Sequence, residues 1–201
     1  MAVRYDIAVD SFFADFSAQV MAEFHAPRSM SVTEVGDTLA QLVWESFSDF
    51  ASRGDAEIAM DELQVQGDHD EALDDHTSEE ALIFFLWAHT RGTRLAFVGR
   101  APDERIDAAL RAMQTAVLDD MRKQGTPASE LPDFEARIKA RCSEYSQAAE
   151  IGQQQLGEAI VRHLTQSEHA RADLAAAVRS RAAAVTSPLR DFFSDVQLTD
   201  A

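Results

Sequence analysis

The densest group of potential metal ligands lies in residues 68–76, where seven of nine side chains carry a carboxylate or an imidazole. Five of them form the candidate metal site: Asp68, His69, Asp70, Asp74 and His76. Carboxylate oxygens suit calcium or magnesium, and histidine combined with carboxylate suits zinc or manganese. The segment lacks the central glycine and final glutamate of an EF-hand loop, and the chain has no His-Glu-x-x-His. We therefore favour a solvated acidic loop, with a bound divalent metal as the alternative.

Motifs of covalent catalysis are missing from the sequence. Cys142 is the only cysteine, and it falls on or near the apolar stripe of a predicted helix, where a thiol usually acts as a small hydrophobic group. No nucleophile elbow, phosphate-binding loop, dinucleotide fingerprint or Glu-x-x-His pair occurs. His89 and His163 are interpreted as core or interface histidines. The sequence favours a non-enzymatic protein without a cofactor; the alternative is a ligand- or metal-binding helical protein, or an enzyme, with an aromatic-lined pocket.

Charge is divided unevenly along the chain, whose formal net charge is −17. Residues 1–90 contain nineteen acidic and three basic residues, whereas residues 91–201 contain sixteen acidic and fifteen basic ones. An acidic field of this size repels nucleic-acid phosphates and anionic membranes, which argues against direct binding to either. The same field attracts and orients a basic surface. We therefore expect the acidic half to bind a basic protein partner, as an inhibitor or a chaperone of basic proteins would.

Several sequence features indicate a cytoplasmic protein. Asp6 and Asp10 interrupt the first apolar stretch, which does not fit a secretory leader. The longest uninterrupted apolar run covers residues 81–88, far short of the roughly 20 residues that span a bilayer. A single cysteine also favours a reducing compartment. We therefore expect no association with a membrane.

Apolar side chains recur at intervals of three and four residues along most of the chain, which places them on one face of a helix. This pattern predicts a first helix over residues 7–24. A second helix starts at a capping box, in which Ser31 and Glu34 satisfy each other's backbone groups, and ends near Gly54. Residues 55–66 fit a short helix, although their pattern is ambiguous between helix and strand.

A nearly all-apolar segment follows the acidic loop and predicts the buried central helix of the fold. Thr77 and Glu80 form a second capping-box pattern at its start, and Gly92 predicts its end. Residues 95–98 fit either a continuation of this helix or a short extended piece. Pro102 suits the first position of the next helix, whose apolar stripe continues to Gly125.

The last third of the chain predicts long helices. A helix of about 30 residues follows Pro132, and Gly152 and Gly157 are places for a kink or a break in it. The alanine-rich residues 168–185 predict a further helix, which Pro188 breaks.

These elements predict an all-α protein, an irregular bundle of six or seven helices with a long C-terminal helix. No alternating run demands a sheet. We expect an acidic helical body over residues 1–124, a linker over residues 125–132, and C-terminal helices over residues 133–201 packed on the body as one domain. A homodimer is a second hypothesis, because small side chains on the long helix permit close approach of a second copy: Ala148, Ala149, Gly152 and Ala159.

Overall fold

The computed structural model describes residues 27–52, 74–167 and 171–200. The helices predicted at residues 7–24 and 55–66 lie outside these ranges. Within the described part of the chain, six helices and one short two-stranded sheet are present. The predicted all-α bundle is therefore confirmed, with a small sheet added to it.

The first described helix, α2 (Val32–Ser52), starts at the predicted capping box. The Ser31 backbone N–H donates to Glu34 Oε2 over 2.8 Å, and the Glu34 N–H donates to Ser31 Oγ over 3.2 Å. These hydrogen bonds lower the pKa of the Glu34 carboxyl group, the one from the Ser31 backbone most of all. The capping box at the start of α2 is confirmed, because each residue satisfies a backbone donor of the other.

The central helix, α4 (Asp75–Phe97), begins differently from its prediction. Its N-cap is Asp74, whose Oδ1 accepts a hydrogen bond of 2.7 Å from the Thr77 backbone N–H. The Thr77 hydroxyl donates instead to the Leu164 carbonyl oxygen over 3.3 Å. The predicted capping box of Thr77 and Glu80 is wrong, because an aspartate three residues earlier occupies the cap position.

Two predicted helix ends are also wrong. Gly92 lies within α4, at a close approach to α8 (Ala172–Phe192), where an added Cβ would lie 2.8 Å from Leu189 Cδ1. This glycine therefore allows two helices to pack closely and does not end one. Pro188 lies within α8, which continues to its end despite it. The proline removes one backbone hydrogen bond to the preceding turn, and the helix nevertheless continues for about one more turn to Phe192.

The predicted break in the long helix is confirmed. Gly152 has extended backbone angles, φ 163° and ψ 166°, and separates α6 (Leu131–Ile151) from α7 (Gln153–Thr165). The preceding helix, α5 (Asp103–Lys123), ends just before Gly125, whose φ of 109° lies in the left-handed region that favours glycine. The connection from α5 to α6 is thus set by a glycine turn.

A parallel two-stranded sheet joins two distant segments, β1 (Arg28–Ser31) and β2 (Val196–Thr199). This sheet could not be predicted from the sequence, because four-residue strands are too short to show a period of two. Arg100 holds the segment that leads into β2. Its guanidinium group donates to four backbone carbonyl oxygens, those of Ala96, Phe193, Ser194 and Val196. The end of the described chain is therefore held against its beginning.

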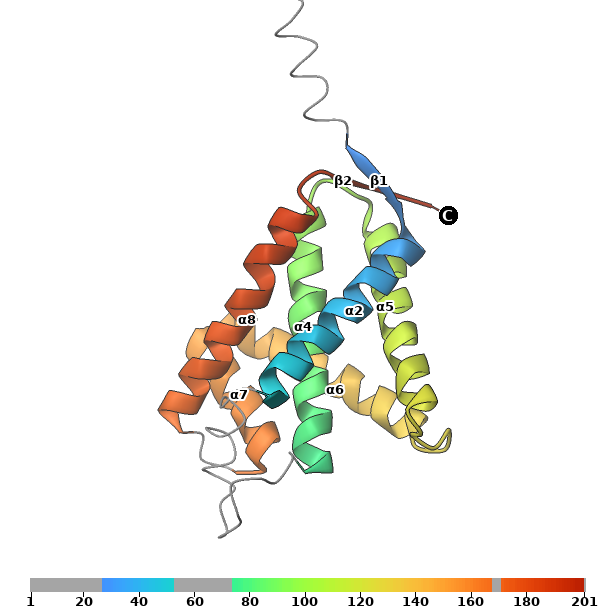
Figure 1. The fold of residues 1–201 in the computed structure, drawn as a ribbon. Coiled ribbons are helices and arrows are strands. Elements are labelled where there is room, and N and C mark those ends of the chain that lie inside the picture. The colour runs from blue at the N-terminus through green and yellow to red at the C-terminus, as the bar shows by residue number, and fades with distance from the viewer. Residues whose placement is uncertain (1–26, 53–73, 168–170, 201) are drawn as a thin grey trace, which may run out of the picture.

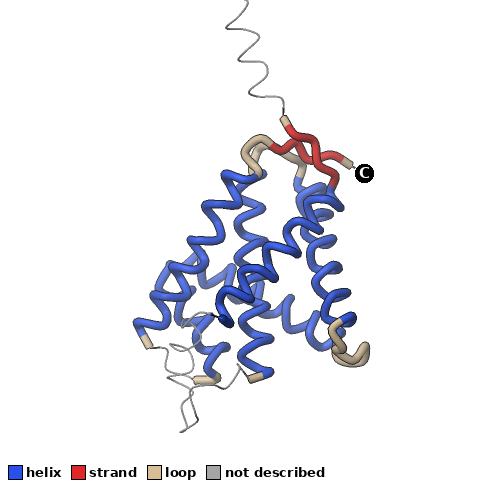
Figure 2. The backbone as a smooth tube through the Cα atoms, viewed as in Figure 1, coloured by secondary structure: helices blue, strands red, loops and turns tan. Residues whose placement is uncertain are grey.

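The helices are arranged around α4, which contacts every other described helix. In Figure 1, α2 crosses in front of α4, with α8 on one side and α5 on the other. Figure 2 shows the strand pair at one end of the bundle. A single cluster of buried apolar side chains includes residues from all six helices and from β2. Within the described ranges, no helix combines the length and the apolar composition that crossing a bilayer requires.

Candidate functional site

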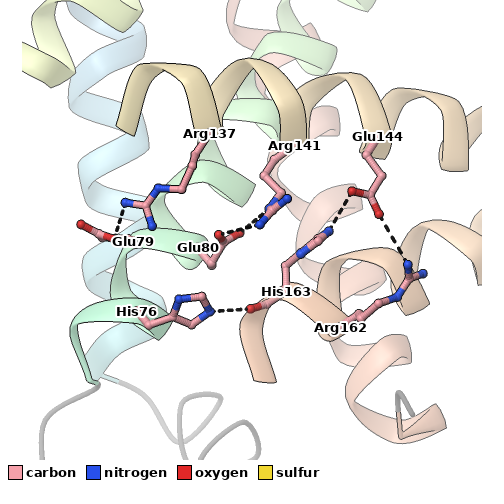
Figure 3. A network of polar contacts seen from close by, with 8 residues as sticks. All are labelled: His76, Glu79, Glu80, Arg137, Arg141, Glu144, Arg162 and His163. Atoms are coloured by element: carbon pink, nitrogen blue, oxygen red, sulfur yellow. Dashed lines mark hydrogen bonds and ion pairs between the residues drawn. The ribbon is translucent and has the colours of Figure 1, made fainter. Parts of the chain in front are cut away.

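An ion-pair network joins α4, α6 and α7 (Figure 3). At its centre the Glu80 side chain is fully buried, and Arg141 meets it with two nitrogens. Arg141 Nε lies 3.1 Å from Glu80 Oε2, and Nη2 lies 3.4 Å from Oε1. A carboxylate removed from water needs such a partner, because an uncompensated buried charge is strongly unfavourable. The pair therefore fixes α6 against the first half of α4.

The cations of the α6 N-terminal half do not form one basic patch. Arg137 pairs with Glu79, and both side chains of that pair remain about one-third exposed. Arg141 pairs with Glu80 in the buried part of the network, whereas Lys139 lies on the rim of a cleft on another side of the helix. Two of these three cations are thus neutralised within the fold.

His163 of α7 connects the three helices of the network. Its Nε2 lies 2.8 Å from Glu144 Oε2, and Arg162 Nη1 lies 3.7 Å from Oε1 of the same carboxylate. His76 Nε2 lies 2.9 Å from the His163 carbonyl oxygen, which can only accept a hydrogen bond. His76 Nε2 therefore carries the proton in this contact. The imidazoles act here as links between helices.

Tyr145 lies fully buried beside the same network. Its ring packs edge-on against Trp87 at a centroid distance of 5.9 Å. Its hydroxyl has no hydrogen-bond partner among the described residues. Burial raises the pKa of the phenol well above its usual range, and the negative charge of Glu80 raises it further. The phenol is therefore protonated at ordinary pH and does not act as a base.

Two of the five predicted metal ligands fall in the described part of the chain, and both have other partners. Asp74 caps α4, and His76 contacts the His163 carbonyl oxygen. Asp68, His69 and Asp70 lie outside the described residues, so the metal site stays a prediction. Among the described residues, no group of three or more His, Cys, Asp or Glu side chains is placed to hold a metal ion.

The histidine and the cysteine of the core have protonation states fixed by burial. His89 Nδ1 lies 2.8 Å from the Phe85 carbonyl oxygen, and burial lowers the pKa of this imidazole to about 4. Burial also raises the pKa of the Cys142 thiol to about 12. The imidazole is neutral and the thiol is protonated at ordinary pH, so neither has the properties of a catalytic group.

A cleft of about 630 Å³ opens between α4, α5 and α6. Its floor is made of aliphatic and sulfur-containing side chains: Leu86, Leu110, Met113, Ile138 and Cys142. Its rim carries charged side chains: Arg94, Asp107, Arg111, Glu135 and Lys139. The volume falls within the roughly 300–1,000 Å³ of small-molecule sites. The lining contains no aromatic side chain, so this cleft differs from the aromatic pocket considered as the alternative.

The solvent-facing side of α2 carries a row of exposed acidic side chains. Its exposed carboxylates, which we call the acidic face of α2, are Glu34, Asp37, Glu45 and Asp49. Steps of three, eight and four residues, with Gln41 in the longest gap, keep these side chains on one face of the helix. No Lys or Arg occurs in α2. Four acids of the first half of the sequence thus lie on one exposed helix face.

These features define a class: an all-α helical-bundle protein with a buried glutamate paired to an arginine, an aliphatic cleft and an acidic exposed helix. No protein-family model matches the chain, and neither the curated proteins nor the solved structures include a significant match to it.

Proposed function

We propose that the protein is a non-enzymatic interaction protein that binds a basic protein through the acidic face of α2. The observation that carries this proposal is the row of exposed carboxylates on a helix without any cation. Complementary charge of this kind accelerates and orients the association of two proteins.

The internal pairing of charges supports this proposal. Arg137 and Arg141, both in the second half of the chain, are neutralised by acids within the fold. Asp37 and Glu45 of α2 form no ion pair with any described residue. Like charges one turn apart on a helix destabilise it by a few tenths of a kcal/mol. A basic partner would relieve this repulsion, which folding leaves in place.

The protonation states of the buried reactive groups also support a non-catalytic protein. The thiol of Cys142 and the phenol of Tyr145 stay protonated, and the imidazole of His89 stays neutral. Each of these shifts is caused chiefly by burial, and none of the three groups is charged at ordinary pH. Tyr145 and His89 therefore serve the core, and the protonated Cys142 thiol acts as an apolar part of the cleft lining.

The remaining sequence predictions fit this proposal to different degrees. A cytoplasmic location agrees with the lone, unpaired Cys142. The acidic field disfavours direct binding of nucleic acid. The homodimer stays a prediction, but two of its small residues, Ala148 and Ala159, are buried within the single chain. Their surfaces are therefore not available to a second copy.

The test is affinity capture from a native lysate with three full-length baits. The first is the wild-type protein, and the second carries Asp37→Asn with Glu45→Gln. The third, a control of matched charge, carries Asp195→Asn with Glu150→Gln, two exposed acids outside α2. Bound proteins are eluted with a salt gradient, because salt screens attraction between exposed charges.

The expected result is a basic protein that the wild type and the control retain, that leaves at moderate salt, and that the α2 variant does not retain. Equal retention by all three baits would overturn the assignment to α2. Retention that does not depend on salt would overturn the electrostatic mechanism.

A further inference from the structure

We propose that the cleft between α4, α5 and α6 binds an amphipathic organic anion. Its aliphatic chain would lie on the apolar floor, and its carboxylate would meet Arg111 and Lys139 on the rim. This site is separate from the acidic face of α2 and adds a small-molecule ligand to the proposed interaction protein.

The cleft exists because α5 and α6 diverge. Both helices pack against α4 but make few contacts with each other, so a gap stays open above the α4 side chains. Leu86 of α4 forms the bottom of the gap, with Met113 of α5 and Ile138 of α6 beside it, and all three are almost fully buried. The floor is therefore formed by aliphatic and sulfur-containing side chains from three helices. An alkyl chain gains free energy by covering such a surface.

The charges on the rim favour an anion as the polar end of the ligand. Arg94 is already neutralised by Asp107, with Nη2 2.7 Å from Oδ1. Arg111 of α5 and Lys139 of α6 are exposed and form no ion pair with any described residue. They approach the cleft from its two walls. A carboxylate accepts several hydrogen bonds at once, so the carboxylate of a bound anion would be the partner that these two cations lack.

Glu135 is the one acidic side chain of the rim that lacks an ion-pair partner among the described residues. It lies one turn before Lys139 on α6, so its charge competes with a bound anion for that lysine. The free rim thus carries two cations and one anion, in a protein whose formal net charge is −17. A local excess of positive charge in so acidic a chain selects for an anionic ligand and against a cationic one.

Ligand class is tested by calorimetric titration of the full chain with three probes of equal chain length. The probes are decanoate, decanol and decyltrimethylammonium, with the two ions used below their micelle concentrations and decanol below its solubility limit. Decanoate is expected to bind about tenfold more tightly than decanol, because hydrogen bonds to charged groups are strong. The ammonium probe is expected to bind most weakly. Equal affinity for all three, or preference for the ammonium, would overturn the proposal.

Four variants locate the site. Arg111→Gln with Lys139→Gln is expected to remove the preference for decanoate over decanol, and Glu135→Gln is expected to strengthen decanoate binding. Ala136→Phe fills the cleft and is expected to abolish binding, whereas Ala140→Phe, an exposed alanine one turn later on the same helix, is the matched control. Binding that survives Ala136→Phe, or that Ala140→Phe removes equally, would overturn the assignment to this cleft.

Discussion

The α4–α6 interface and the exposed side of α2 use acidic residues in opposite ways. At the interface, Glu80 is fully buried and held by two nitrogens of Arg141. On α2, Asp37 and Glu45 face solvent and form no ion pair with a described residue. Some acids of the first half therefore hold the fold together, and others shape the surface field. Whether an acid is paired and buried or exposed depends on its tertiary contacts, so it cannot be read from the number of charges along the chain.

The largest expected effect comes from removing the partner of the buried acid. Arg141→Met leaves Glu80 buried without a compensating charge, so the free energy of unfolding should fall by about 3 kcal/mol or more. Urea unfolding measures this loss. Combining Glu80→Gln with Arg141→Met removes the charge itself and should restore part of the stability.

The matched control for this prediction is Arg137→Met, one turn away on α6. Its partner Glu79 is about one-third exposed, so water takes over much of the interaction when the arginine is lost. The expected loss is below about 1 kcal/mol. Similar losses for the two arginine variants would mean that burial does not distinguish the two pairs.

A second effect is expected at His89, a buried residue of α4. Burial lowers its pKa from 6.5 to about 4 in the folded chain. Between these pH values the unfolded chain binds a proton that the folded chain does not, so stability is fully present above pH 6.5 and falls as the pH falls. The expected loss by pH 4 is about 3 kcal/mol.

His89→Gln isolates this contribution, because all other titrating groups stay in both proteins. Unfolding in urea between pH 4 and pH 7 should give a shallower pH dependence for the variant than for the wild type. An identical pH dependence in the two proteins would show that His89 is not the group responsible.

The third prediction tests how α2 is held in position. An added Cβ at Gly36 would lie 2.9 Å from the Met113 backbone nitrogen on α5 and closer still to Ala112 Cβ. Gly36→Ala should therefore cost about 1–2 kcal/mol, although alanine is the better helix former. Adding Ala112→Gly should recover part of the loss. A Gly36→Ala protein as stable as the wild type would mean that α2 and α5 are not packed this closely.

Features that depend on neighbouring residues could be predicted from the sequence. Ser31 and Glu34 lie three residues apart and form their capping box within a single turn of chain. The break at Gly152 likewise reflects a local property of the backbone. The apolar stripes of α2 and α5 predicted helices because their spacing encodes one face directly.

Features that depend on distant residues could not be predicted. Gly92 is typical of a helix end until Leu189, nearly a hundred residues away, is known to pack on it. Glu80 directly precedes the all-apolar run of α4, and this position indicates that the acid is buried. Nothing in the neighbouring sequence identifies Arg141 as its partner. The cleft was also missed, because it arises from the divergence of α5 and α6 and from no motif within either helix.

If Asp37 and Glu45 serve a partner and not the fold, they contribute little to the free energy of unfolding. The most direct test is the unfolding free energy of the variant with Asp37→Asn and Glu45→Gln, measured at about 20 mM and about 1 M salt. The free energy of unfolding of the variant is expected to equal that of the wild type or to exceed it by a few tenths of a kcal/mol at low salt, with no difference at high salt. A loss of about 1 kcal/mol or more at both salt concentrations would mean that these carboxylates hold the structure together.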